Sequence, residues 1–465
     1  MTQTTTFELD QVFGEDSKGD APEERAQSSR RLFVRSQHQI SVARSESTGR
    51  RYSASEMLRE YGWNRLRELV DHTAVPVVMK GSDPVTQLKE ALRHLGVEPR
   101  TAFGKAKWSQ DSIAAFEKSQ QVPFGDLERL SQFLSLDAHA LGQKSDIDAA
   151  ELGVRLRSLG DGQTHFSTAM VLALAEAGWV VRKQLQLAEL LGKARAVFDH
   201  QPSDDYGSLN SPAWRKGHQL AAETREKLAL GWDRPIESMT GLLEELGIPV
   251  IHVELPKDFA GATISSGSIR GIVINTLGKN NNVWVRRMTM AHELGHFLWD
   301  PPARLQKLVV DSYSELERDF TKTKDKVEQR ANAFAVELLA PEAMISSIYR
   351  DAANPTQGII EIMQHFGVGR AAATYHVQNT IGEPVRADRI NEEPDGALVA
   401  REEFVVSYPA LDALPISRRG RFVELVVEAV SRNLLSEDTA AAYLSCPKDQ
   451  LRPVLDFVSN LDTPV

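Results

Sequence analysis

Two histidines and a glutamate stand close together in the second half of the chain, in the pattern H-E-x-x-H. The residues are His292, Glu293 and His296. On an α-helix, residues four positions apart lie on the same face, about 40° apart around the helix axis. Both imidazoles can therefore bind one metal ion, while the carboxylate between them can act as a general base toward a metal-bound water molecule. The pattern predicts a hydrolytic metal site.

The residues around this pattern have the periodicity of one helix, from residue 283 to residue 299. The histidines and Glu293 fall on one side of it, as expected for a helix that forms one wall of a cleft. Gly295 is a weak helix former, so we expect it to admit a strand or a substrate close to the helix. Pro301 and Pro302 end the helix. The apolar residues on the opposite arc are Met290, Ala291, Leu294, Phe297 and Leu298.

A catalytic zinc ion needs a third protein ligand and one open position for water. The only cysteine is Cys446, which lies far along the chain, so a carboxylate is the expected ligand. Glu328 is the best candidate, because it lies in a second helical segment that Pro341 ends. Asn332 is one turn further along the same face. It can hydrogen-bond a ligand histidine, or it can be an ordinary amide on the helix surface.

Several neighbouring residues have weaker claims to a role. Glu337 falls on the opposite side of the second helix and is interpreted as a solvated surface residue. Glu315 and Glu317, in a charged stretch, are rivals of Glu328 for the metal. Three residues could donate a hydrogen bond to an oxyanion, although a structural role is the simpler interpretation of each: Tyr313, Tyr375 and His376.

Taken together, the two segments resemble a known family. H-E-L-G-H followed by E-x-x-A-N-x-F-A-x-x-L-L-x-P is similar to the motifs of the ImmA/IrrE group of metallopeptidases, and the resemblance covers roughly residues 205–385. It implies a zincin-like α/β core in which Zn²⁺ is bound by His292, His296 and Glu328, with Glu293 as the base. Ala340 departs from the family pattern, since many members have Met there. We expect that difference to change packing and to leave the chemistry intact.

The composition predicts an ordinary globular protein with about two to four domains. The chain has 465 residues, of which 42% are hydrophobic and 25% charged, and its net charge of −10 argues against a broad nucleic-acid-binding surface. One cysteine and the lack of an apolar signal core favour a reducing cytoplasm. The longest apolar stretch, residues 169–181, contains Glu176. We interpret it as a buried helix and expect no contact with a membrane.

We predict a mostly α fold with a small β-sheet (α+β), in which a zincin-like peptidase domain is flanked by helical domains. Residues 1–55 are poor in apolar side chains and are expected to form a disordered tail. Its basic part, residues 30–51, could contact phosphates or could simply be solvated. The other predicted units are a helical domain (56–145), a helical connector (146–202), the peptidase domain (203–390) and a C-terminal helical module (397–465).

Residues 84–140 have the helix spacing of a phage-repressor-type (XRE-like) helix-turn-helix domain. Ser109 would cap the third of four helices, and that helix would enter the major groove of DNA. The candidate DNA contacts are Arg100, Lys105, Lys107, Gln110 and Ser112. Two features favour a structural or protein-binding role instead. The segment is close to neutral, and Lys107 occupies a turn position where such modules commonly have glycine.

The last third of the chain is predicted to be helical. Residues 359–379 again have helix-turn-helix spacing, and His365 and His376 within them are interpreted as packing or surface residues. Residues 420–458 are predicted to form a compact module whose second helix is capped by Ser436. Its predicted core residues are Phe422, Leu425, Val426, Ala429, Leu451, Val454 and Leu455.

Two functions stay open at this point. The first is a cytoplasmic zinc endopeptidase that cuts a regulatory protein; the resemblance implies a repressor-like substrate in stress response or mobile-element control. The helix-turn-helix could hold such an enzyme on DNA. The second is a non-enzymatic DNA-binding regulator, or an antitoxin with a toxin partner, that uses the zincin fold as a sensor or scaffold. The intact Glu293 favours the enzyme, because a scaffold does not need a general base.

Overall fold

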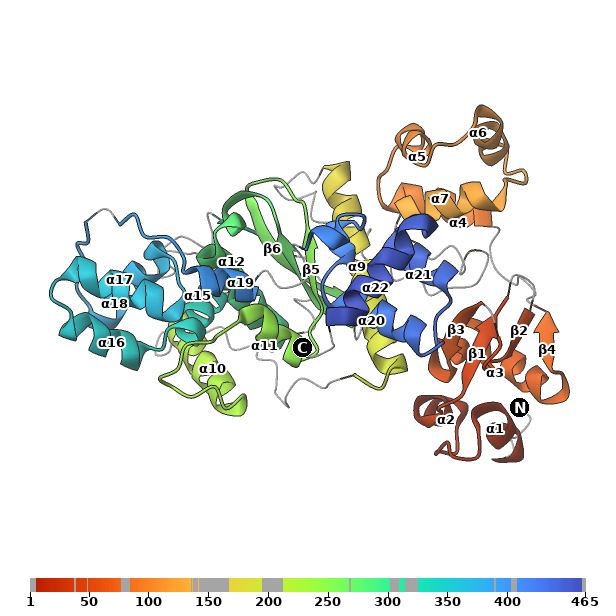
Figure 1. Ribbon diagram of the computed structural model, residues 1–465, viewed down its shortest axis with the longest axis horizontal. Coiled ribbons are helices and arrows are strands. Elements are labelled where there is room, and N and C mark those ends of the chain that lie inside the picture. Colours follow the sequence, from red (N-terminus) through yellow and green to blue (C-terminus); the bar gives the residue numbers. More distant parts are fainter. Residues whose placement is uncertain are drawn as a thin grey trace.

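Most of the described chain is helical, with two four-stranded sheets far apart in the molecule (Figure 1). The computed structural model describes residues 6–36, 39–47, 49–76, 84–134, 136, 141, 167–194, 212–266, 269–301, 309–313, 325–388, 390–402 and 408–461. The predicted fold class, mostly α with a small β component, is confirmed.

The first sheet belongs to an N-terminal region whose described residues form four strands and three helices. Strands β1 (Leu32–Arg35), β2 (Gln39–Val42), β3 (Arg50–Ser53) and β4 (Ala74–Pro76) are antiparallel and lie in the order β3-β1-β2-β4. Helix α3 (Ala54–Asp71) packs against this sheet, and α1 (Thr6–Phe13) and α2 (Pro22–Ser28) pack against α3. Ser53 and Glu56 form a capping box that fixes the start of α3.

The prediction of a disordered tail over residues 1–55 is therefore wrong for the part that the structure describes. Apolar residues are few there, but their positions let Phe13, Phe33, Ile40 and Tyr52 meet in one buried cluster with α3. Burial of each such side chain stabilises the fold by about 1.5–3 kcal/mol. The low average content of apolar residues does not reveal this contribution. Part of the basic stretch is also buried, since Arg50 is 2% exposed and lies over the ring of Tyr52.

Four short helices follow, close to the predicted positions: α4 (Pro84–His94), α5 (Pro99–Lys105), α6 (Gln110–Glu117) and α7 (Phe124–Phe133). Ser109 caps α6, as expected, by accepting a hydrogen bond from the backbone of Ser112. Lys107 has a φ of 53°, the left-handed turn conformation that favours glycine. The aromatic rings of Phe103, Trp108 and Phe116 hold these helices together.

One of the predicted DNA contacts is wrong. Ser112 is buried at 5% exposure and its hydroxyl donates to the carboxylate of Asp126 in α7. It lies on the face of α6 that packs inward, because the helix turns it away from its exposed neighbour Gln110. Arg100, Lys105, Lys107 and Gln110 are exposed, and their contact with DNA stays a prediction.

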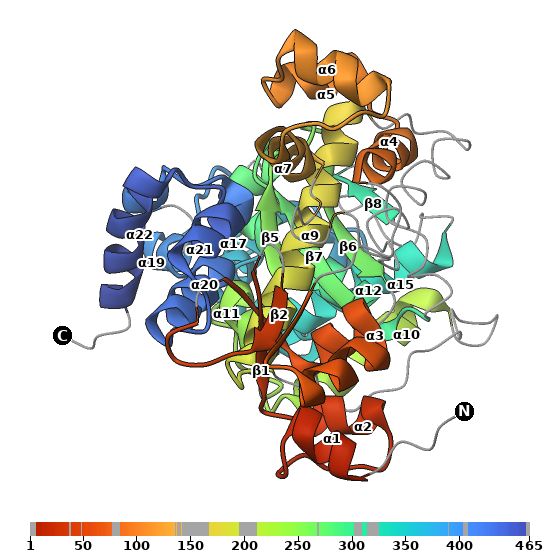
Figure 2. The same ribbon diagram turned by 90° about the vertical axis from the view of Figure 1, so that its right-hand side faces the viewer.

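The second sheet lies at the centre of the molecule, between helices on its two faces (Figure 2). Its strands are β5 (Val250–Val253), β6 (Phe259–Ser266), β7 (Ile269–Asn275) and β8 (Val309–Ser312), in the order β5-β7-β6-β8. β5 is parallel to β7, and the other two pairs are antiparallel. Alternate residues of β7 enter different cores: Val273 packs with α9, and Ile272 packs with α12.

Helix α9 (Thr168–Leu190) covers one face of this sheet and α12 (Val283–Trp299) covers the other. Val181 of α9 fits directly over Gly271, where a Cβ atom would lie 2.5 Å from the valine methyl group. The helix predicted inside the connector 146–202 is thus a structural layer of the central domain. Residues 146–166 and 195–202 of that prediction lie outside the described residues.

The remaining helices of the central domain pack on α12, on α15 or on one another. They are α10 (Ala213–Lys227), α11 (Met239–Glu245), α15 (Lys326–Leu339), α16 (Glu342–Asp351), α17 (Pro355–Phe366), α18 (Arg370–Ile381) and α19 (Gly396–Glu402), with the short turn η3 (Gly278–Asn281) before α12. Helices α10 and α15 approach closely at Gly217, where a Cβ atom would lie 2.4 Å from the carbonyl oxygen of Arg330. Buried Glu402 ties α19 to α12 by its ion pair with Arg287.

The C-terminal module has the predicted helices, α20 (Arg421–Ser431), α21 (Glu437–Leu444) and α22 (Lys448–Leu461), after two short turns, η5 (Pro409–Leu411) and η6 (Ile416–Arg418). Ser436 caps α21, and all seven predicted core residues are buried. The module shares its core with α9. In the described parts of the chain, no helix is both long enough and apolar enough to cross a membrane.

Candidate metal centre

Helix α12 has the predicted bounds and places the H-E-x-x-H residues inside the domain. His292 and Glu293 are fully buried and His296 is 3% exposed. The opposite arc, with Met290 and Leu294, packs into the core between α12 and its neighbours. The predicted separation of an apolar back from a polar front is confirmed, although the polar front also lies in the interior.

Glu328, in the first turn of α15, brings its carboxylate to the two imidazoles. Its Oε2 atom lies 3.3 Å from Nε2 of His292 and 3.5 Å from Nε2 of His296, and the two Nε2 atoms are 3.0 Å apart. These three residues form a buried group that could hold a metal ion. The structure thus brings together the residues that the sequence selected.

The spacing of the three donor atoms fits zinc. Zinc binds imidazole nitrogen and carboxylate oxygen at about 2.0–2.2 Å, which gives a tetrahedron with edges of about 3.3–3.6 Å. The observed separations of 3.0, 3.3 and 3.5 Å are close to that range. Three protein donors also leave one of four positions for solvent, as catalytic zinc sites do.

The charges around the group favour a bound cation. Burial alone would lower the pKa of His296, but the carboxylates of Asp300 and Glu328 outweigh it and raise that pKa well above its ordinary value. Burial would likewise raise the pKa of Glu328, yet the two histidines hold it well below the ordinary value. The site therefore stabilises positive charge beside an ionised carboxylate, and a metal ion would take the place of the proton.

Asp300 is a residue that the sequence interpretation missed. Its Oδ2 atom lies 2.9 Å from Nδ1 of His296, and its other oxygen pairs with Arg330 of α15. This hydrogen bond orients the ring so that Nε2 faces the cluster. Its position four residues after His296 was a usable signal. The sequence proposed that Asn332 would hydrogen-bond a ligand histidine, but at His296 this contact is made by Asp300. Asn332 is 1% exposed and lies one turn beyond Glu328. Its role stays a prediction.

Glu293 is held from the side of the sheet by β6. The hydroxyl of Thr263 donates to Oε2 of Glu293 over 2.7 Å, and a Cβ atom on Gly261 would lie 3.0 Å from Oε1. Gly261 and Thr263 are two residues apart, so both face α12. Neither residue carries a local sequence signal for this role, because the contact depends on how β6 packs against α12.

Other sequence interpretations have mixed outcomes. A side chain does approach Gly295, but it belongs to Phe334 of α15, whose ring would lie 2.9 Å from an added Cβ atom. Tyr313 has a structural role, since its hydroxyl donates to Leu277 and accepts from the backbone of Asn280. Tyr375 is half-buried on α18. Glu315 and Glu317 lie outside the described residues.

The interpretation of Glu337 as a solvated residue is wrong. Its side chain is 13% exposed and lies 3.2 Å from Nε2 of His376, which is itself buried. Its carboxylate also accepts a hydrogen bond from the backbone of Glu342 at the start of α16. The helical periodicity correctly put Glu337 opposite Glu328, but that side of α15 is covered by α10 and α18.

Residues 243–378 match a peptidase family described as the IrrE N-terminal-like domain. The matched range contains the central sheet, α12 and α15, and with them His292, Glu293, His296 and Glu328. It covers less than a third of the chain and does not reach the four helices at 84–133, so it offers no support for a helix-turn-helix domain there. No curated protein matches the chain. The fold and the site define a metallopeptidase-like domain with a buried His-His-Glu cluster.

Proposed function

We propose that the central domain is a cytoplasmic zinc-dependent endopeptidase. The observation that carries the proposal is the position of Glu293, which is buried beside His292 and His296 and fixed by Thr263. A metal site that only stabilised the fold would be complete without this carboxylate. Its presence next to the cluster supports a reaction in which a proton must be removed from water.

In the proposed mechanism, His292, His296 and Glu328 would hold a zinc ion, which would polarise a peptide carbonyl and lower the pKa of a bound water to about 7. Glu293 would take a proton from the attacking water and pass it to the leaving amine. The hydrogen bond from Thr263 to Oε2 would hold the carboxylate in place for this transfer. Asp300 keeps the ring of His296 in its ligating orientation.

The proposed substrate is a regulatory protein of the repressor type, in stress response or mobile-element control. The match to a peptidase family supports a protein substrate. The three cluster residues are at most 5% exposed. Such burial strengthens the electrostatic interactions among the donor atoms.

The decisive test replaces Glu293 with Gln. Glu293→Gln should keep one equivalent of tightly bound zinc but reduce cleavage by about 10²–10⁴-fold, the contribution typical of general acid–base catalysis. Fragments are compared by mass spectrometry in cells that express the wild type or the variant, and the variant serves as bait for uncut substrate. His296→Ala is the control that should lose both zinc and cleavage. The proposal would be refuted if cells with Glu293→Gln contained the same fragments as cells with the wild type.

A second candidate is a non-enzymatic DNA-binding regulator or antitoxin. It is supported by the left-handed turn at Lys107, between α5 and α6, with Arg100, Lys105 and Gln110 exposed nearby. The full chain should then bind duplex DNA with an affinity that falls steeply with salt. A Lys105→Glu substitution should weaken that binding. DNA binding that persists in Glu293→Gln, without cleavage in either protein, would favour this candidate over the peptidase.

A further inference from the structure

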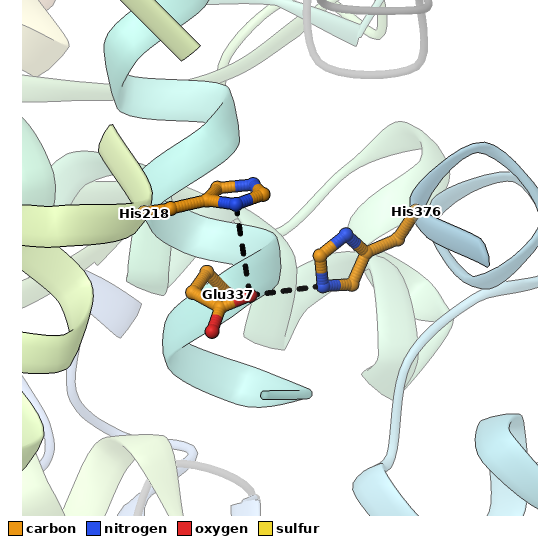
Figure 3. A group of neighbouring side chains, drawn as sticks. All are labelled: His218, Glu337 and His376. Atoms are coloured by element: carbon orange, nitrogen blue, oxygen red, sulfur yellow. Dashed lines mark ion pairs between the residues drawn. The ribbon is translucent and has the colours of Figure 1, made fainter. Parts of the chain in front are cut away.

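Helix α15 carries a second His-His-Glu cluster on the side opposite Glu328. Glu337 is nine residues further along the helix, which places it about 180° around the axis. His218 of α10 and His376 of α18 turn their rings toward its carboxylate from two sides (Figure 3). This group, which we name the distal cluster, shares no residue with the cluster of His292, His296 and Glu328.

The donor atoms of the distal cluster lie close together, but one of the two measured separations is longer than a hydrogen bond. Oε2 of Glu337 lies 3.2 Å from Nε2 of His376 and 3.9 Å from Nδ1 of His218. All three donors lie within 4.8 Å of one another. The side chains of His218 and Glu337 are 12% and 13% exposed, and that of His376 is 1% exposed. Such burial distinguishes the group from a chance gathering of surface residues.

We propose that the distal cluster binds a second divalent metal ion of the zinc class. Two imidazoles and a carboxylate are a donor set that zinc prefers, and the tetrahedral edge of about 3.3–3.6 Å lies between the two measured separations. Glu342 supplies a fourth donor, since its carboxylate lies 3.7 Å from Nδ1 of His218 and is about half exposed, at 51%. Small rotations of side chains are enough to close the set around one ion.

The protonation of His218 supports this assignment. Burial, together with the neighbouring His376, lowers the pKa of His218 to about 4, against the opposite pull of Glu337. At neutral pH the imidazole is therefore uncharged, as a metal ligand must be. Glu337 is also held in place before any metal binds, because its carboxylate accepts from the backbone of Glu342.

The distal cluster should bind its ion more weakly than the cluster on α12. Nε2 of His376 is 2.9 Å from the carbonyl oxygen of Ala340, so in the metal-free protein it carries a proton and donates to that carbonyl. Metal binding at Nε2 would require this proton to move to Nδ1 of the same ring, and the hydrogen bond to Ala340 would be lost. The distal cluster would then fill when zinc is plentiful and tie α10, α15 and α18 together.

This inference does not depend on peptidase activity, and its test measures metal alone. Full-length protein is stripped with a chelator and equilibrated by dialysis against increasing free Zn²⁺, and bound zinc is measured by mass spectrometry. The wild type should bind two equivalents, one tight and one weak. The double variant His292→Ala/His296→Ala should keep only the weak one, and His218→Gln or Glu337→Gln should keep only the tight one.

Two controls make the outcome decisive. The tight equivalent retained by His218→Gln and Glu337→Gln reports that these variants are folded. His365→Ala removes an exposed histidine from α17 and should leave both equivalents in place. The proposal is overturned if the wild type saturates at one equivalent, if both distal variants still bind two, or if His365→Ala loses the weak equivalent as they do.

Discussion

The two His-His-Glu clusters have the same composition but are assembled in different ways. In the first, two histidines come from one turn of α12 and only Glu328 comes from elsewhere. In the distal cluster, His218, Glu337 and His376 come from three helices that are far apart in sequence (Figure 3). The first has donor separations of 3.0–3.5 Å, whereas the two measured in the second are 3.2 and 3.9 Å.

The difference shows what local geometry contributes to a binding site. The helix itself positions two residues at i and i+4. Most of the conformational entropy that His292 and His296 must lose to bind one ion is therefore already lost when α12 forms. The position of each ligand in a site made of three helices depends on tertiary packing. A small shift of any one helix therefore changes the separations between the donor atoms. We therefore expect tight binding with chemistry at the first cluster, and weaker binding with a stabilising effect at the second.

The largest effect should come from replacing Glu328, and the second glutamate of α15, Glu337, provides the control. Glu328→Ala removes a buried ligand from the first cluster, so tightly bound zinc and cleavage should both be lost. Glu337→Ala, on the opposite side of the same helix, should leave both unchanged. Zinc content after dialysis and cleavage of the trapped substrate are the measurements. A full equivalent of zinc held at nanomolar affinity by Glu328→Ala would place the third ligand elsewhere.

The next effect concerns Asp300, whose carboxylate lies 2.9 Å from Nδ1 of His296. Asp300→Asn keeps the shape but weakens the bond to Nδ1 of His296, and loss of such a partner typically costs about 10–100-fold in metal affinity or activity. Competition with a chelator measures the affinity. The distal cluster should bind as before. Asp351→Asn, an exposed change on α16, is the matched control, and an equal loss there would show that Asp300 has no specific role.

The two clusters also show which residues could be predicted from the sequence and which could not. His292, Glu293 and His296 were found because their spacing is that of one helix, and Glu328 because its helix has a distinct pattern ending at Pro341. Thr263 could not be found, since its hydrogen bond to Glu293 requires β6 to lie beside α12. Glu337 was misjudged for the same reason, because periodicity gives the side of a helix but not what covers that side.

The fold was predictable to a similar degree. The helices at 84–133 and 421–461 were anticipated from apolar spacing and capping residues such as Ser109 and Ser436. The N-terminal sheet was missed, because its strands have only four or fewer residues each. Short strands carry little periodicity, and their stability comes from packing on α3, which no local window contains.

A smaller effect is expected from the glycines that let α15 approach its neighbours. In Gly217→Ala the new Cβ atom meets the backbone oxygen of Arg330, which cannot move easily, whereas in Gly295→Ala it meets the ring of Phe334. Overpacking of this kind costs about 1–3 kcal/mol, and Gly217→Ala should be the more destabilising in urea unfolding. It should weaken the distal cluster through its neighbour His218, and Gly295→Ala should weaken the first cluster.

Gly104→Ala in α5 is the control for these two variants. Among the described residues, and apart from its own helix, nothing lies within 4 Å of a Cβ atom at that position, so the substitution should be neutral or stabilise by up to about 1 kcal/mol through helix propensity. If all three alanine variants have the same free energy of unfolding, close packing of α15 is not what these glycines provide.

The smallest effect should come from the cap of α15. The side chain of Asp325 accepts from the backbone of Val327 over 2.8 Å, and loss of such a cap costs about 1 kcal/mol. Fraying in Asp325→Ala would reach Glu328, in the first turn, but not Glu337, three turns along. Zinc affinity should fall slightly at the first cluster alone. Ser436→Ala removes the comparable cap of α21, and should cost similar stability without any change in zinc binding. A fall at both clusters in Asp325→Ala would mean that α15 responds as one rigid body, and that the two sites are coupled through it.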